Sequence, residues 1–184
     1  LAADADEAAR LAAQLGYPVA LKLSGPHLLH KSELGALALG LREEAEVRDS
    51  FARLRAIREA DGADVLVEAM AEPGVELVIA ARGDAVVPAL VVGLGGIWTE
   101  ALDDVAVIPL PADATRIERE LRRLRGAPLL FGGRGREGVD VGAVCALAEG
   151  AGRLLLSARL SLLELNPVIA SAGGAVAADA LARR

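Results

Sequence analysis

The chain has 184 residues, is 53% hydrophobic and carries a net charge of −6, and only 2% of its residues are aromatic. This length and hydrophobic content allow a packed core, in one domain or in two small lobes. The acidic balance and the lack of aromatic side chains argue against a nucleic-acid-binding protein, and the single cysteine, Cys145, excludes an internal disulfide framework.

The first part of the chain alternates between helices and strands. Residues 4–15 predict an amphipathic helix that ends at Gly16, and the acidic character of this stretch is unlike a signal peptide. Short apolar strands are expected at 18–23 and 35–41, and an amphipathic helix over 43–60.

From residue 64 to residue 110 the pattern predicts one strand after another. A doubly wound parallel sheet would place a helix between successive strands, so this order favours an α+β lobe with largely antiparallel pairing. The expected strands are 64–70, 75–81, 85–96 and 105–110.

The last part of the chain predicts two helices, at about 113–124 and 139–156, and then a final strand pair formed by "LSLLELN" and "GAVAADA". Cys145 falls within the second of these helices and is expected to serve only as packing. We expect no apolar run that reaches the roughly 18 residues needed to span a bilayer. We therefore expect a cytoplasmic protein that binds neither membranes nor nucleic acids.

Both lysines and both histidines of the chain lie within residues 22–31, whereas all other basic residues are arginine. Lys22 ends an apolar strand, where it is either an edge charge that reaches water or an ammonium directed at phosphate oxygens. The segment that follows, "SGPHLLHKSELG", combines glycine, proline and polar donors, a composition suited to folding over an anionic ligand.

A second group of polar residues lies near the end of the chain. "ELNP" ends an apolar strand with an acid and an amide on the same side, and Asp179 follows Asn166 after a turn at Gly173–Gly174. A hairpin of that length can bring Asn166 and Asp179 together, and their oxygens suit Mg²⁺ held jointly with nucleotide phosphates. Taken alone, Asn166-Pro167 is equally consistent with a simple turn.

Seven segments in order resemble the ATP-grasp domain of NDP-forming acyl-CoA synthetases. They are "GYPVALKLSGPHLLHKSELGA", "VLVEAM", "GVELVIAARGD", "VVGLGGIWTE", "GGRGREGVD", "LELNP" and "AVAADA". The group includes ADP-forming acetyl-CoA synthetase and is related to the succinyl-CoA synthetase beta subunit. The resemblance implies an α+β ATP-grasp fold of two lobes, residues 1–66 and 67–184, with the nucleotide between them and the domain's first strand missing.

The resemblance also implies roles for individual residues. Lys22 matches the strand lysine that contacts nucleotide phosphates. His30 matches a loop histidine that relays phosphate, and Glu76 an acid that points toward the phosphates. The remaining matches are the adenine-binding segment Glu68, Ala69 and Met70, and the metal ligands Asn166 and Asp179.

The activity implied is acid–thiol ligation: acyl-CoA, ADP and phosphate give acid, CoA and ATP, with ATP/ADP and Mg²⁺ bound and phosphohistidine as the carrier. The partners implied are the CoA-binding and phosphohistidine domains of the same enzyme, in the same chain or in a separate subunit. These parts lie outside the 184 residues, so we expect the isolated chain to be inactive.

The sequence leaves alternatives open for the function and for the role of one glycine-rich turn. Glu33 and Ala36 replace the aspartate and glycine usual in the "HKS" loop, which is compatible with a degenerate ATP-grasp module that regulates a fused protein acetyltransferase. An ATP-grasp carboxylate–amine ligase is disfavoured because the "HKS" loop indicates phosphohistidine relay. The glycines of "VVGLGG" fit either an approach to phosphate or close backbone packing.

Overall fold

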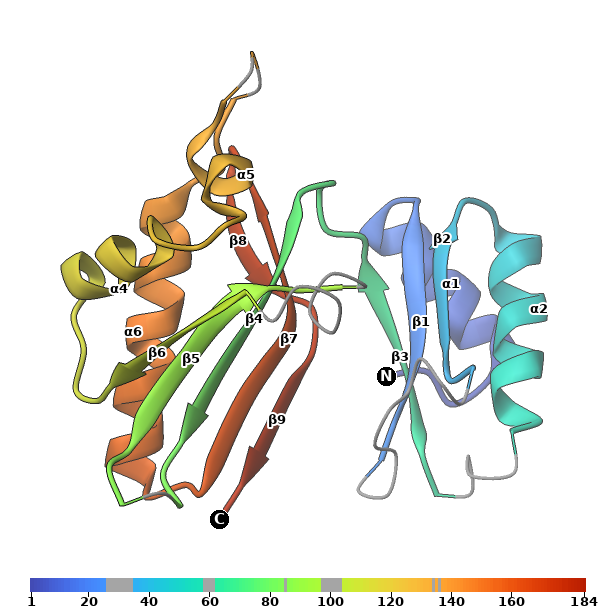
Figure 1. Cartoon of the computed structure of the whole chain (residues 1–184). Helices are drawn as coiled ribbons and strands as arrows, with labels where there is room; N and C mark the ends of the chain where they lie inside the picture. Colours follow the sequence, from blue (N-terminus) through green and yellow to red (C-terminus); the bar gives the residue numbers. More distant parts are fainter. Residues whose placement is uncertain (26–34, 58–61, 85, 97–103, 134, 136) are drawn as a thin grey trace. The chain divides into compact units, whose positions relative to one another are not determined.

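The structure is a computed structural model in which the chain forms two compact units, Leu1–Met70 and Ala71–Arg184. Figure 1 shows the elements of both units. The boundary expected from the sequence, between residues 66 and 67, falls inside a strand that stays with the first unit. The described residues are 1–25, 35–57, 62–84, 86–96, 104–133, 135 and 137–184.

The first unit is a three-stranded antiparallel sheet in the order β2-β1-β3 with two helices. Asp4 caps the first helix by accepting a hydrogen bond from the Glu7 amide, and Gly16, with φ of +85°, ends it as the sequence predicts. The elements are α1 (Ala5–Leu15), β1 (Val19–Ser24), β2 (Leu37–Leu41), α2 (Glu44–Arg55) and β3 (Asp64–Ala69).

The core of this unit lies between one face of the sheet and the two helices. Val19, Leu21 and Leu23 alternate along β1 and are fully buried, because a strand places every second side chain on the same face. They pack with alanines of α1 and with Phe51 and Leu54 of α2. The opposite face of β1 therefore carries Ala20 and Lys22.

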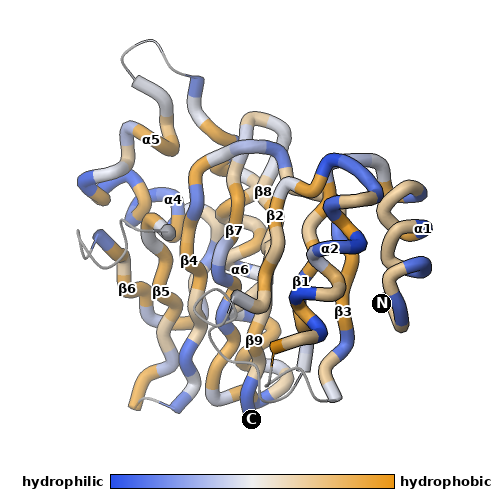
Figure 2. Tube along the Cα trace, turned by 90° about the vertical axis from the view of Figure 1, so that its right-hand side faces the viewer, coloured by the Kyte–Doolittle hydropathy of each residue, from blue (hydrophilic) through white to orange (hydrophobic). Residues whose placement is uncertain are grey.

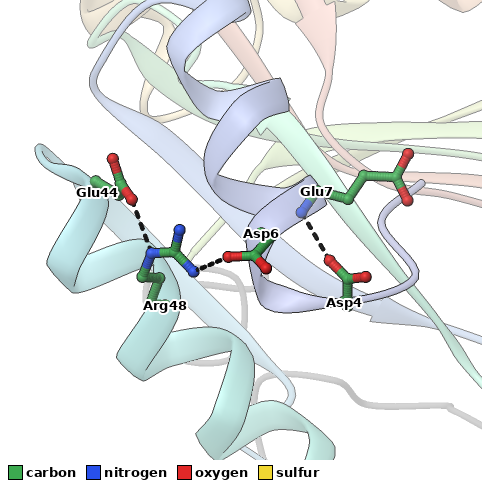
Figure 3. A network of polar contacts seen from close by, with 5 residues as sticks. All are labelled: Asp4, Asp6, Glu7, Glu44 and Arg48. Carbon is green, nitrogen blue, oxygen red and sulfur yellow. Dashed lines mark hydrogen bonds and ion pairs between the residues drawn. The ribbon is translucent and has the colours of Figure 1, made fainter.

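A polar network on the surface joins the two helices of the first unit (Figure 3). Arg48 of α2 donates hydrogen bonds to Glu44 one turn earlier, at 2.8 Å, and to Asp6 of α1. These bonds raise the pKa of the Arg48 guanidinium. Exposed pairs of this kind contribute little stability, so the buried residues of the two helices, rather than this network, hold them in place.

The second unit is a six-stranded antiparallel sheet in the order β6-β5-β4-β7-β8, with β9 also paired to β7. The antiparallel pairing expected for residues 64–110 is confirmed. The elements are β4 (Val75–Arg82), β5 (Ala89–Leu94), β6 (Val105–Pro109), α4 (Ala114–Leu121), α5 (Ala127–Phe131), α6 (Val141–Ala158), β7 (Leu162–Ser171), β8 (Gly174–Ala177) and β9 (Ala180–Arg183).

One face of this sheet is covered by helices. Leu77 and Ile79 of β4 and Leu90 and Val92 of β5 are fully buried against α4 and α6. Figure 2 shows β4, β5 and β7 coloured mainly as hydrophobic along their lengths. Cys145 of α6 is buried in this core, and burial, with a smaller contribution from the charge of Glu118, raises the pKa of its thiol to about 11.

Helix α6 is the one described helix with the length and mean hydropathy of a membrane span, which corrects the expectation that no segment reaches this length. The run is not purely apolar, because it contains Glu149 and Arg153. Its buried residues form part of the core of the second unit, and core helices have this same composition.

The structure differs from the sequence prediction in three further elements. The described helix α2 ends at Arg55, whereas the pattern predicted a helix to residue 60, and residues 58–61 lie outside the described residues. The short helix α5 was not predicted, since five residues show no helical periodicity. The expected final strand pair is in fact three strands, because the returning chain breaks between β8 and β9 and pairs with β7 on both sides of the break.

Candidate functional site

Lys22 and Glu68 form an ion pair in the first unit. Lys22 lies opposite Leu66 and Glu68 lies opposite Ala20 in the β1–β3 ladder, so the two are diagonal neighbours on the sheet face turned away from the helices. Lys22 Nζ is 2.6 Å from Glu68 Oε2, and their side chains are 9% and 38% exposed. Lys22 is therefore a buried cation rather than an edge charge extended into water.

Ala69 and Met70 follow Glu68 at the end of the first unit. Both are exposed, and the Met70 amide donates a hydrogen bond to the Pro18 carbonyl at 3.3 Å. The structure thus places the three residues of the predicted adenine-binding segment at one end of β3, beside the beginning of β1. Their contact with adenine remains a prediction.

Glu76 lies near the beginning of β4, and the glycine turn after β5 packs directly against it. The Gly95 amide donates a hydrogen bond to the Glu76 carbonyl at 2.7 Å. A Cβ on Gly96, whose φ is +67°, would lie 2.7 Å from Glu76 Oε2. The turn needs glycine at position 96 because φ is positive there, and at Gly95 because a Cβ would lie 2.9 Å from the Leu77 backbone nitrogen, which favours the packing interpretation of these glycines.

Asn166 and Asp179 are brought together in the second unit, as the sequence predicts. The Asn166 amide donates a hydrogen bond to the Asp179 carbonyl at 3.1 Å. Asp179 lies in the break between β8 and β9, where its Oδ1 accepts a hydrogen bond from the Ala180 amide at 3.0 Å.

A β-bulge at Asn166 was not visible in the sequence. Leu77 pairs with Val168 and Ile79 with Leu165, so Asn166 and Pro167 together stand opposite the single residue Val78. A bulge of this kind bends the strand and redirects a side chain, and such bulges are frequent beside active sites.

Glu164 is a residue that sequence reasoning left out of the site. Asn166 Nδ2 donates a hydrogen bond to Glu164 Oε1 at 3.1 Å. The bond occupies the amide nitrogen of Asn166, so its amide oxygen is the atom available to accept from a ligand or to bind a cation. The signal was present in "ELNP", where the acid and the amide are two residues apart on one strand face.

The structure gives less information on the predicted phosphate-relay histidine and on the number of metal ligands. His30 of the "HKS" loop lies outside the described residues. Among the residues that the structure describes, no group of three or more histidine, cysteine or acidic side chains is placed to hold a metal. Asn166 and Asp179 would thus supply two ligands, with phosphate oxygens and water as the others.

Comparison with known proteins supports the same family. Residues 1–183 match the model of an ATP-grasp domain. A trans-feruloyl-CoA synthase from an unknown prokaryotic organism is 39% identical over 98% of this chain, which spans 27% of that relative. The ADP-forming acetate–CoA ligase II subunit beta of Pyrococcus furiosus is 32% identical over 98% of this chain and 80% of its own length.

The solved structures that resemble this chain come from the same group of enzymes. The dinucleotide-forming acetyl-coenzyme A synthetase 1 of Ca. Korarchaeum cryptofilum, in complex with coenzyme A and Ca-AMPCP, has a TM-score of 0.91 at 33% identity, over 100% of this chain and 83% of that one. The same synthetase with Mg-AMPPCP and its phosphohistidine segment pointing towards the nucleotide-binding site has a TM-score of 0.82 at 34% identity, over 97% and 81%. The chain therefore belongs to the ATP-grasp domain family, and its relatives include ADP-forming acetate–CoA ligases.

Proposed function

We propose that this chain is the nucleotide-binding component of an NDP-forming acyl-CoA synthetase. The observation that carries the proposal is the contact between Asn166 and Asp179, two residues 13 positions apart (179 − 166) that the fold joins at a β-bulge. This backbone contact brings together two residues whose side chains, an amide and a carboxylate, carry oxygen donors of the kind that Mg²⁺ shares with nucleotide phosphates.

The proposed roles follow from charge and position. Lys22 contacts the phosphates of ATP or ADP, since a buried ammonium is a compact point charge that an anion can neutralise. Glu68, Ala69 and Met70 border the adenine. Glu76, held against the glycine turn, faces the phosphates. Asn166 and Asp179 hold Mg²⁺, which when bound neutralises phosphate charge and orients the transferred group.

The reaction proposed is acyl-CoA + ADP + phosphate ⇌ acid + CoA + ATP, with the phosphoryl group carried on histidine. His30 is the residue of this chain that we propose for the relay. The structures that resemble this chain include one with a phosphohistidine segment directed at the nucleotide-binding site, which supports such a relay.

The partners proposed are the CoA-binding and phosphohistidine domains of the same enzyme. The chain spans about a quarter of the length of the trans-feruloyl-CoA synthase relative and most of a β subunit, so further domains or a second subunit complete those enzymes. We propose that the isolated chain binds nucleotide and does not turn over acyl-CoA. The relatives named above are ligases and synthases, which supports a catalytic role over regulation of a fused acetyltransferase.

The experiment that tests the function combines this chain with the CoA-binding part of its enzyme. ATP formation from ADP, phosphate and an acyl-CoA should require both parts and Mg²⁺. Calorimetry on the chain alone should detect Mg-dependent ADP binding. A chain that binds no nucleotide under these conditions would overturn the proposal, and one that binds nucleotide but adds no turnover would favour the regulatory alternative.

A further inference from the structure

The Lys22–Glu68 ion pair raises a question about how nucleotide reaches Lys22. The ammonium is 9% exposed, and a carboxylate oxygen already lies 2.6 Å from it. Each partner is held by regular strand pairing, since Ala20 faces Glu68 and Lys22 faces Leu66 in an uninterrupted register. The structure thus shows the proposed phosphate-binding cation already neutralised by a residue of the same chain.

An incoming phosphate and this carboxylate need the same ammonium. Both are anions that accept short, charge-assisted hydrogen bonds from it, and two anions near one cation repel each other. Glu68 is the more exposed member of the pair, at 38%, so its side chain has room to turn away when a stronger anion arrives. Lys22, enclosed on the sheet face, stays in place.

We propose that Glu68 is an internal competitor of the nucleotide phosphate for Lys22. The carboxylate holds the ammonium in position and balances its charge while no nucleotide is bound, and a phosphate group displaces it. This inference rests on the proposed function. It assigns the Glu68 carboxylate a task beyond its place beside the adenine: the carboxylate weakens nucleotide binding, which favours release in a reaction that runs in both directions.

The two roles predict opposite results for Glu68→Gln, which removes the charge and keeps the shape. A competitor that is neutralised should let ADP bind more tightly, by about tenfold, whereas loss of an adenine contact should weaken ADP and adenosine alike. Calorimetry with ADP, adenosine and inorganic diphosphate on the full chain separates them. The gain in affinity for ADP and for diphosphate should exceed any change in affinity for adenosine. Equal or weaker ADP binding by Glu68→Gln overturns the proposal.

A second comparison, made in the Lys22→Met variant, tests whether Glu68 acts through Lys22. Adding Glu68→Gln to Lys22→Met should not tighten ADP binding, because the shared cation is gone. This comparison can be made even if Glu68→Gln alone fails to fold. The double variant removes both charges of the ion pair, so it leaves no buried charge without a partner. Tighter ADP binding by the double variant than by Lys22→Met would mean that Glu68 acts without Lys22, which overturns the proposal.

Failure of the proposed function has a different signature. If the wild-type chain binds no ADP, or if Lys22→Met binds ADP as well as the wild type does, both the phosphate role of Lys22 and the competitor role of Glu68 are wrong. If Lys22→Met loses affinity while Glu68→Gln does not gain it, only the competitor role is wrong.

Discussion

Asn166 donates its backbone amide to the carbonyl of Asp179 at 3.1 Å, and this contact joins two strand segments at the β-bulge of β7. The bond fixes the backbones from which both side chains project. Those side chains carry an amide oxygen and a carboxylate, which are ligands of the kind that Mg²⁺ prefers. The relationship makes the metal-binding prediction directly testable.

Asp179→Asn should reduce the Mg²⁺ dependence of ADP binding. The substitution keeps the size of the side chain and removes its charge, and a change of this kind at a metal ligand should cost at least about tenfold in metal affinity. Calorimetry of ADP binding with and without Mg²⁺ measures the effect.

The matched control is Asp84→Asn, which removes another acid of the second unit. Asp84 pairs with Arg82 at 2.8 Å on the surface, where the hydrogen bond from Arg82 lowers the pKa of its carboxyl. An exposed ion pair contributes little to stability, so Asp84→Asn should fold normally and keep the Mg²⁺ dependence of ADP binding seen in the wild type. If the two variants show the same Mg²⁺ dependence of ADP binding, Asp179 is not a metal ligand.

Lys22→Ala should weaken ADP binding by about 1.5–3 kcal/mol, the range of a hydrogen bond to a charged group. Lys22→Arg should restore only part of the loss, because a planar guanidinium does not fit the position of a compact ammonium. Arg10→Ala is the control, since Arg10 is an exposed cation of the first unit paired with Glu7. Calorimetry that finds the same ADP affinity in Lys22→Ala and the wild type would contradict the assignment.

Two glycines of α6 should respond in opposite directions to alanine. Gly150 has open space at its Cβ position, so Gly150→Ala should raise the free energy of unfolding by about 0.5–1 kcal/mol through helix propensity. A Cβ on Gly152 would lie 2.6 Å from a methyl carbon of Leu110, so Gly152→Ala should lower stability by about 1–3 kcal/mol through overpacking. Denaturant unfolding measures both, and the same sign for the two would show that local space does not decide the outcome.

Cys145 should make stability fall at alkaline pH. Its thiol pKa rises from 9.0 to about 11 on folding because the side chain is buried, so the unfolded chain loses this proton first as the pH increases. The stabilisation is complete below pH 9 and is lost between pH 9 and 11, by about 1–2 kcal/mol. Cys145→Ala should show a smaller decrease over this range, measured by denaturant unfolding at each pH.

His30 and His27 can be separated in the complete enzyme. His30→Ala should stop transfer of labelled phosphate to ADP, because His30 is the residue proposed for the relay and a cation such as its sequence neighbour Lys31 would stabilise a phosphoryl group on the ring. His27 follows Gly25-Pro26, where a turn is expected, and His27→Ala should keep most of the activity. Normal turnover by His30→Ala would exclude it from the relay.

Much of the fold was predictable because its signals are local. The helix before Gly16, the apolar alternation of β1 and the succession of strands from β3 to β6 each follow from side-chain periodicity and turn residues within a short window. The sequence prediction was less successful where periodicity is weak, as in the five-residue helix α5, and where pairing between distant strands decides the structure, as in the split of the last strand into β8 and β9.

Residue type and order alone predict the antiparallel strands and the ATP-grasp family, because strand periodicity is local and the family motifs occur in a set order. How the candidate site residues meet depends instead on tertiary contacts. The β1–β3 register sets Glu68 against Lys22. Pairing of the returning chain with β7 brings Asp179 to Asn166, which stands at a bulge of that strand. Register and bulges depend on pairing between segments far apart in the chain, which no local pattern encodes.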